Sequence, residues 1–135
     1  MKKIIVSKQN IWVRKMAKKY SIPPDSLKKI LKRDKHCVYC HKKMILPGKG
    51  IKQRNCATVE HMKDKSPFNI PETIAICCGS CNSSRRMSFT KWFKSQYCLD
   101  RNINEKTVAN PVKAYMRMIG RMSPEKRKTF VLKNY

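Results

Sequence analysis

Two CxxC motifs constrain this chain more than any other feature. The first spans Cys37–Cys40, the second spans Cys78–Cys81, and 37 residues separate them. Each motif can place two sulfurs on one metal ion, and together they complete the closed tetrahedral shell of a structural zinc site. Such a site has no open coordination position, so it stabilises a fold and carries out no chemistry. We expect one structural Zn²⁺ bound by Cys37, Cys40, Cys78 and Cys81, and a fold that fails without it.

The other cysteines and histidines are less suitable metal ligands because of their positions in the sequence. Cys77 could replace Cys78, but a Cys77–Cys81 pair makes a wider turn. Cys77 also ends an apolar run and suits a buried position. The reserve ligands beside the first motif are His36 and His41, and the expected unligated thiols are Cys56 and Cys98.

The start of the chain bears on the redox state of these thiols. Only three consecutive apolar residues, Ile4–Val6, follow the basic opening, far short of the apolar region of a signal peptide. We therefore expect an intracellular protein, in the cytoplasm or nucleus, in which metal binding is favoured over disulfides. A thioredoxin-like redox pair would need a βαβ pattern, which the sequence lacks.

The charge indicates the partner. With 32 Lys and Arg against 8 Asp and Glu, the formal net charge is +24 on 135 residues. The basic residues are spread along the whole chain, which favours a continuous positive face that binds nucleic acid. DNA is the leading partner, and charge alone leaves RNA open. No apolar run reaches the roughly 20 residues that span a bilayer, so no membrane partner is expected.

Residues 1–35 are expected to form a basic helical segment. Apolar residues recur at helical spacing after a cap at Asn10, and Pro23-Pro24 separates this helix from a second. The pair resembles a helix-turn-helix, but plain scaffolding gives the same spacing and is the interpretation we favour. The polar face of the second helix is a candidate nucleic-acid surface made of Lys28, Lys29, Lys32 and Arg33.

The rest of the chain divides into β-prone and helical segments. Short β-prone runs are expected at residues 43–46, 57–61 and 73–77. Helices are then expected to open at Ser88, at Asn110-Pro111 and at Ser123-Pro124, the first presenting residues up to Tyr97. The aromatic side chains most able to stack on bases are expected to lie in the core instead: Trp12, Trp92 and Tyr97.

An acid-histidine pair lies between the two cysteine motifs, and an asparagine follows the second. Glu60-His61 lies in the run TVEHM, and Asn82 lies in the run TIAICCGSCNSSRR. Both runs follow the first cysteine motif, CVYC. In this order they resemble the HNH endonuclease family, whose zinc-bearing members run CxxC, an acid-His pair, a strand, and CxxCN with a basic residue soon after. The resemblance covers about residues 28–97.

The resemblance implies a role for each matching residue. His61 matches the general base, and Glu60 and Asn82 match the side chains that bind one catalytic divalent ion. A neutral imidazole can take a proton from water at cellular pH, and hard oxygens suit Mg²⁺ or Mn²⁺. Arg85 and Arg86 could hold the scissile phosphate or its neighbour.

One position departs from the family pattern. The family has an asparagine nine positions before the metal-binding one, where this chain has Thr73. That asparagine braces the loop that carries the base, and a threonine hydroxyl would do this in part. Asn69 is a candidate substitute. Each catalytic role also has a structural alternative. Glu60 could form an ion pair, His61 could be a core histidine, and Asn82 could cap a helix.

The sequence thus predicts an α+β protein with a zinc-stabilised HNH-like ββα centre between basic helices. The expected segments are 1–35, a nuclease core at 36–98, and a basic helical extension at 99–135, packed as one unit. The expected activity is hydrolysis of DNA phosphodiesters to 5′ phosphate and 3′ hydroxyl ends. One ββα site cuts one strand, so cutting both would need a homodimer or two visits. The rival hypothesis is a non-catalytic nucleic-acid-binding or packaging protein on an HNH scaffold.

Overall fold

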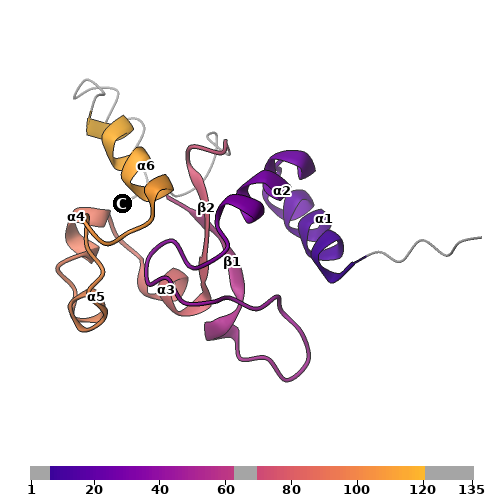
Figure 1. Ribbon diagram of the computed structural model, residues 1–135, viewed down its shortest axis with the longest axis horizontal. Coiled ribbons are helices and arrows are strands. Elements are labelled where there is room, and N and C mark those ends of the chain that lie inside the picture. Colours follow the sequence, from indigo (N-terminus) through magenta and orange to yellow (C-terminus); the bar gives the residue numbers. More distant parts are fainter. Residues whose placement is uncertain (1–6, 63–69, 121–135) are drawn as a thin grey trace, which may run out of the picture.

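The computed structural model describes residues 7–62 and 70–120, which form a small mixed fold of helices around a two-stranded sheet (Figure 1). In chain order the elements are α1 (Lys8–Tyr20), α2 (Pro24–Arg33), the 3₁₀ turn η1 (Gln53–Asn55), β1 (Ala57–His61), β2 (Ile74–Cys78), α3 (Gly79–Ser84), α4 (Phe89–Trp92), α5 (Gln96–Arg101) and α6 (Asn110–Gly120). The helix expected at Ser123-Pro124 lies outside the described residues, as does Asn69.

The first two helices begin and end where local chemistry requires. The N-cap of α1 is Ser7, whose hydroxyl accepts from the amide of Asn10, so the predicted cap at Asn10 is wrong by one turn. Ser21 ends α1 in the left-handed conformation, with φ of 53°. Pro24 then occupies the first turn of α2, where its missing N–H costs no hydrogen bond.

The sheet is an antiparallel pair in which Ala57 lies opposite Cys78 and His61 lies opposite Ile74. Side chains alternate between the two faces of a strand. Val59, Ile74 and Ile76 therefore pack into one hydrophobic cluster, on the side of α1 and α2. All five residues of β2 are buried, because both faces of this strand are covered.

The helices fill both sides of the sheet. Figure 1 shows α1 and α2 on one side and α4 to α6 on the other. Apolar residues of α1 and α2 pack on the first face: Trp12, Val13, Ala17, Leu27 and Ile30. A second cluster covers the opposite face and includes Tyr39, Ala75, Phe89, Trp92, Val112 and Tyr115. The expected core positions of Trp12 and Trp92 are confirmed, and neither indole is exposed for stacking on a base.

The free edge of β2 is held by the chain that follows α2. The carboxylate of Asp34 accepts from the amide of Ile76 at 3.0 Å, and the guanidinium of Arg33 donates to the carbonyl of Ile74 at 2.8 Å. Val38 also donates its amide to the carbonyl of Ile76. These contacts satisfy backbone groups that a two-stranded sheet leaves unpaired, and they fix the first cysteine motif against β2.

Two predicted elements differ from the structure. Residues 43–46 form no strand and make only isolated bridges, Lys43 with His36 and Ile45 with Cys56. The helix expected from Ser88 to Tyr97 is split into α4 and α5, because Ser95 caps a new helix with its hydroxyl. The strands expected at 57–61 and 73–77 are confirmed, the second shifted by one residue.

No helix within residues 7–62 and 70–120 is long and apolar enough to cross a bilayer.

Candidate metal centre and its surroundings

The four cysteines of the two CxxC motifs lie together. Their sulfurs all fall within 4.8 Å of one another, and Cys40 and Cys78 are 3.8 Å apart. Cys37 and Cys40 come from the loop after α2, Cys78 ends β2, and Cys81 lies in α3. Three of the side chains are buried and that of Cys40 is partly exposed. This arrangement is typical of a structural metal site, because it is closed by protein ligands on every side.

Local backbone geometry builds each half of the cluster. The amide of His41 donates to the carbonyl of Cys37, and His41 adopts a left-handed φ of 63° to close this turn. In the second half, the amide of Cys81 points at the sulfur of Cys78. Gly79 packs against η1 so closely that a Cβ there would lie 2.1 Å from the carbonyl oxygen of Gln53. The second motif therefore needs glycine at this position.

Crowding perturbs the thiol pKa values in opposite directions. Hydrogen bonding from Cys37 lowers the pKa of Cys78 to about 6 and also lowers the pKa of Cys40. Hydrogen bonding to Cys40 raises the pKa of Cys37, and hydrogen bonding to Cys37 raises the pKa of Cys81. Without a metal, Cys37 and Cys81 thus favour the thiol form, and Cys40 and Cys78 favour the thiolate. A divalent cation would replace those protons and allow all four sulfurs to ionise.

The other sulfur and imidazole groups lie outside the cluster, which is the only such group among the described residues. Cys77 is fully buried on β2, with its sulfur 3.6 Å from the hydroxyl of Thr58. Cys56 and Cys98 are buried free thiols. The ring of His41 contacts the carbonyl of Thr107 instead.

Glu60 takes part in a buried polar network. Its Oε2 accepts from the hydroxyl of Tyr39 at 2.8 Å and from Nε of Arg85 at 3.0 Å. Both charged side chains are almost fully buried. Arg85 also donates to the carbonyls of His61, Met62 and Met87, at 2.8, 2.9 and 3.0 Å. The ion pair that the sequence left open for Glu60 therefore exists, but in the interior.

This network was missed by sequence reasoning, which assigned Arg85 to a phosphate. The guanidinium of Arg85 faces inward and lies over the ring of Phe89, 4.4 Å from its centroid. The only available signal was spacing: Arg85 lies three residues after Asn82 and is the C-cap of α3. The neighbouring Arg86 is exposed. Among the described residues, its guanidinium donates to the carbonyl of Ser83.

Asn82 and Glu60 lie on the same face of β1, and His61 lies on the other. The side-chain nitrogen of Asn82 donates to the hydroxyl of Thr58 at 2.9 Å and to the carbonyl of Val59 at 3.3 Å. The ring of His61, at the end of β1, makes an edge contact with Tyr20 of α1, with centroids 4.9 Å apart. The helix α1 thus contributes to the surroundings of the predicted base.

Thr73 is fully buried and closes the turn that enters β2. Its hydroxyl donates to the carbonyl of Ile70 at 3.1 Å and accepts from the amide of Ile70 at 3.3 Å. Its own carbonyl accepts from the amide of Met62, directly after the predicted base. Thr73 therefore braces both sides of the connection between β1 and β2.

The candidate nucleic-acid residues of α2 divide into two groups. Lys28, Lys29 and Lys32 are exposed. Arg33 is exposed as well, but its guanidinium pairs with Asp34 at 2.8 Å and donates to the carbonyls of Pro71 and Ile74. A polyanion can therefore reach all four side chains, although Arg33 already makes contacts within the fold.

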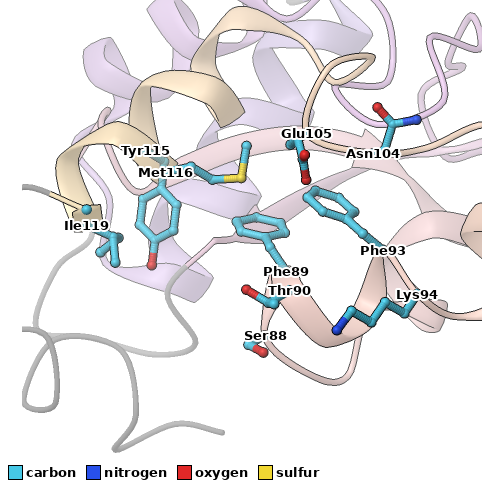
Figure 2. Close-up of a pocket in the computed structure, with 11 residues that line it drawn as sticks. Ser88, Phe89, Thr90, Phe93, Lys94, Asn104, Glu105, Tyr115, Met116 and Ile119 are labelled. Atoms are coloured by element: carbon cyan, nitrogen blue, oxygen red, sulfur yellow. The ribbon is translucent and has the colours of Figure 1, made fainter.

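A pocket of about 600 Å³ lies between α4 and α6 (Figure 2). The rings of Phe89 and Phe93 stack in its wall with centroids 5.6 Å apart, and Tyr115 meets Phe89 edge-on. None of the predicted site residues lines this pocket. Its apolar wall belongs to the core cluster beneath α6, and it adds nothing to the chemistry of the metal centre.

Comparison of the chain with protein-family models, curated proteins and solved structures found no match. Function must therefore be argued from the residues and their geometry.

Proposed function

We propose that this protein is a zinc-stabilised, divalent-ion-dependent DNA endonuclease of the HNH type. The observation that carries the proposal is the position of Asn82. It directly follows a ligand of the cysteine cluster and is hydrogen-bonded to β1, the strand that bears Glu60 and His61. The cluster thus ties the candidate ion ligands to the strand with the candidate base.

The residues would share the work as follows. His61 takes a proton from the attacking water. The side-chain oxygen of Asn82 and Oε1 of Glu60 are the ion ligands, because the nitrogen of Asn82 is held by Thr58 and Oε2 of Glu60 is held by Arg85. Mg²⁺ or Mn²⁺ bound there would stabilise negative charge on the phosphate and the leaving 3′ oxygen. The net charge of +24 would bring DNA to the site.

Nicking of supercoiled plasmid tests this proposal. The protein should nick with Mg²⁺ or Mn²⁺ and not with chelator, and His61→Ala and Asn82→Ala should each lower the rate at least about 100-fold, the usual minimum for a general base. His36→Ala is the matched control, since His36 is exposed and outside the cluster. Zinc content and DNA affinity should match the parent in all three variants. Nicking by His61→Ala within about tenfold of the parent would refute the assigned base.

A second candidate function is supported by the buried network around Glu60. Arg85 neutralises this carboxylate and Tyr39 donates to the same oxygen, so an incoming ion would compete with a formed ion pair. On this hypothesis the fold is a non-catalytic nucleic-acid-binding protein. It predicts tight, salt-sensitive binding with no nicking in any divalent ion. Competition between duplex DNA and duplex RNA at matched salt would then identify the preferred polymer.

A further inference from the structure

A basic cleft of about 560 Å³ lies on the outer side of the cysteine cluster. Lys42 reaches it from the loop after the first motif, Arg54 from η1 and Arg101 from α5. The rest of the lining is Ser80, Tyr97, Asn55 and the cluster cysteine Cys40. No acidic residue is among the described residues that line it. Three cations around one hollow supply charged donors for phosphate oxygens.

Several polar groups of the cleft are already positioned by contacts within the fold. The guanidinium of Arg101 lies 3.6 Å from the ring centroid of Tyr97 and donates to the carbonyl of the same residue. Nζ of Lys42 donates to the side-chain oxygen of Asn55 at 3.2 Å. The hydroxyls of Ser80 and Tyr97 are 2.8 Å apart. Groups held in place before binding lose less conformational freedom when a ligand arrives.

The three cations have no acidic partner in the described part of the chain. Ion pairs there join Arg33 to Asp34 and Arg85 to Glu60, and the cleft contributes to neither. The hydroxyl of Tyr97 also donates to the sulfur of Cys81 at 3.2 Å. The wall of the cleft is therefore anchored on the metal cluster.

We propose that this cleft is a phosphate-binding site, and that its ligand is a backbone phosphate of the bound nucleic acid. The inference rests on the proposed nucleic-acid partner and does not require cleavage. The rival explanation is that the cations only balance the metal cluster, since four thiolates and one Zn²⁺ carry a net charge of −2. In that case the cleft residues would control metal retention instead of DNA affinity.

The salt dependence of DNA binding tests the proposal. The variant Lys42→Ala with Arg54→Ala removes two cleft cations, and Lys91→Ala with Lys106→Ala is the control, with equal charge loss from exposed lysines outside the cleft. Each lost phosphate contact lowers the slope of log affinity against log salt by about 0.9, which is roughly an eightfold loss of affinity at 0.1 M salt. Both variants are measured with chelated magnesium, so that cleavage plays no part.

Three results bear on the outcome. A slope reduced by about 1 in the cleft variant, unchanged in the control, with zinc content equal to the parent, supports the backbone phosphate. An unchanged slope with faster zinc loss to a chelator overturns the proposal in favour of charge balance. An unchanged slope together with chemical-shift changes at Ser80 and Arg54 on adding inorganic phosphate, absent with chloride at equal ionic strength, assigns the site to free phosphate.

A second variant keeps the test independent of the stability of the first. Asn55→Asp places a carboxylate beside Lys42 without shortening any side chain. It should lower the slope as the double variant does, because the carboxylate competes with the phosphate for Lys42. Parent-like affinity in folded Asn55→Asp would overturn the proposal. Nicking separates this inference from the proposed activity, since His61→Ala should abolish nicking and leave the slope unchanged.

Discussion

Replacing Arg85 by methionine tests whether the buried network around Glu60 holds the fold together. The side chain of Arg85 is 3% exposed and that of Glu60 is 6% exposed. Among the described residues, Arg85→Met leaves Tyr39 as the donor to the interior carboxylate of Glu60. It also removes the donor from three backbone carbonyls, those of His61, Met62 and Met87. The methionine keeps the apolar stem, so cavity formation contributes little.

The expected loss follows from these contacts. Removing one partner of a buried ion pair costs about 3–5 kcal/mol, because the other charge stays buried without compensation. The carbonyl of Met62 places this case at the upper end of that range, since it is a buried acceptor that loses a donor, whereas the carbonyls of His61 and Met87 are part-buried. Tyr39→Phe removes one hydrogen bond to a charged group and should cost less, about 1.5–3 kcal/mol. Total stability of small proteins is about 5–15 kcal/mol, so Arg85→Met should leave a marginal fold.

Urea unfolding with saturating zinc, followed by circular dichroism, measures these values. With a slope near 2 kcal/mol/M, a loss of about 4 kcal/mol moves the midpoint by about 2 M. Arg86→Met is the matched control, because Arg86 is exposed, and its cost should stay below about 0.5 kcal/mol. Adding Glu60→Gln to Arg85→Met should recover part of the loss by removing the buried charge. A cost below about 1 kcal/mol for Arg85→Met would show that the interior ion pair is wrong.

Three further predictions concern the cluster and its surroundings. Gly79→Ala should destabilise the fold by more than about 2 kcal/mol in the same unfolding assay, because the new Cβ would overlap the carbonyl of Gln53. The control is Gly120→Ala, whose Cβ meets open space and which should cost less than about 0.5 kcal/mol. Stripping the metal with a chelator should abolish the far-ultraviolet helical signal, since metal binding supplies roughly 10–16 kcal/mol in small zinc peptides. Added Zn²⁺ should restore the signal. A native spectrum in protein that elemental analysis shows to be metal-free would contradict this prediction. Tyr20→Ala should slow nicking with little change in DNA affinity, because its ring contacts that of His61, while Tyr20→Phe keeps the ring contact and should nick faster than Tyr20→Ala.

The parts of the fold that the sequence predicts well are those with local signals. The CxxC motifs identify the four clustered thiols by spacing alone, and the separation of Cys77 from them follows because it continues the strand pattern of β2. The strand at residues 57–61 is predicted by its β-forming side chains, among them Thr58 and Val59. The break at Pro23-Pro24 places the start of α2, since proline disfavours helix before it and favours it after.

The errors come from contacts between distant segments. Residues 43–46 have β-forming side chains but form only single bridges, Ile45 with Cys56 at the entry to β1 and Lys43 with His36. The partnership of Arg85 with Glu60 joins positions 25 apart in sequence, and a basic residue after CxxCN looks equally suited to a phosphate. Charge and spacing cannot tell whether a guanidinium turns inward. That depends on the buried acceptors that β1 and Tyr39 present.

Several parts of the fold depend on the cysteine cluster, and this dependence decides which variants are informative about function. The cluster joins the loop after α2 to the junction of β2 and α3, and the hydroxyl of Tyr97 in the basic cleft donates to one of its sulfurs. Replacing a cysteine would therefore disturb the position of Asn82, the shape of the cleft and the stability of the fold together. Loss of nicking in such a variant would carry no information about catalysis. Function can be separated from folding only at side chains that the cluster positions and that do not hold it: His61 for cleavage, and Lys42 with Arg54 for phosphate binding.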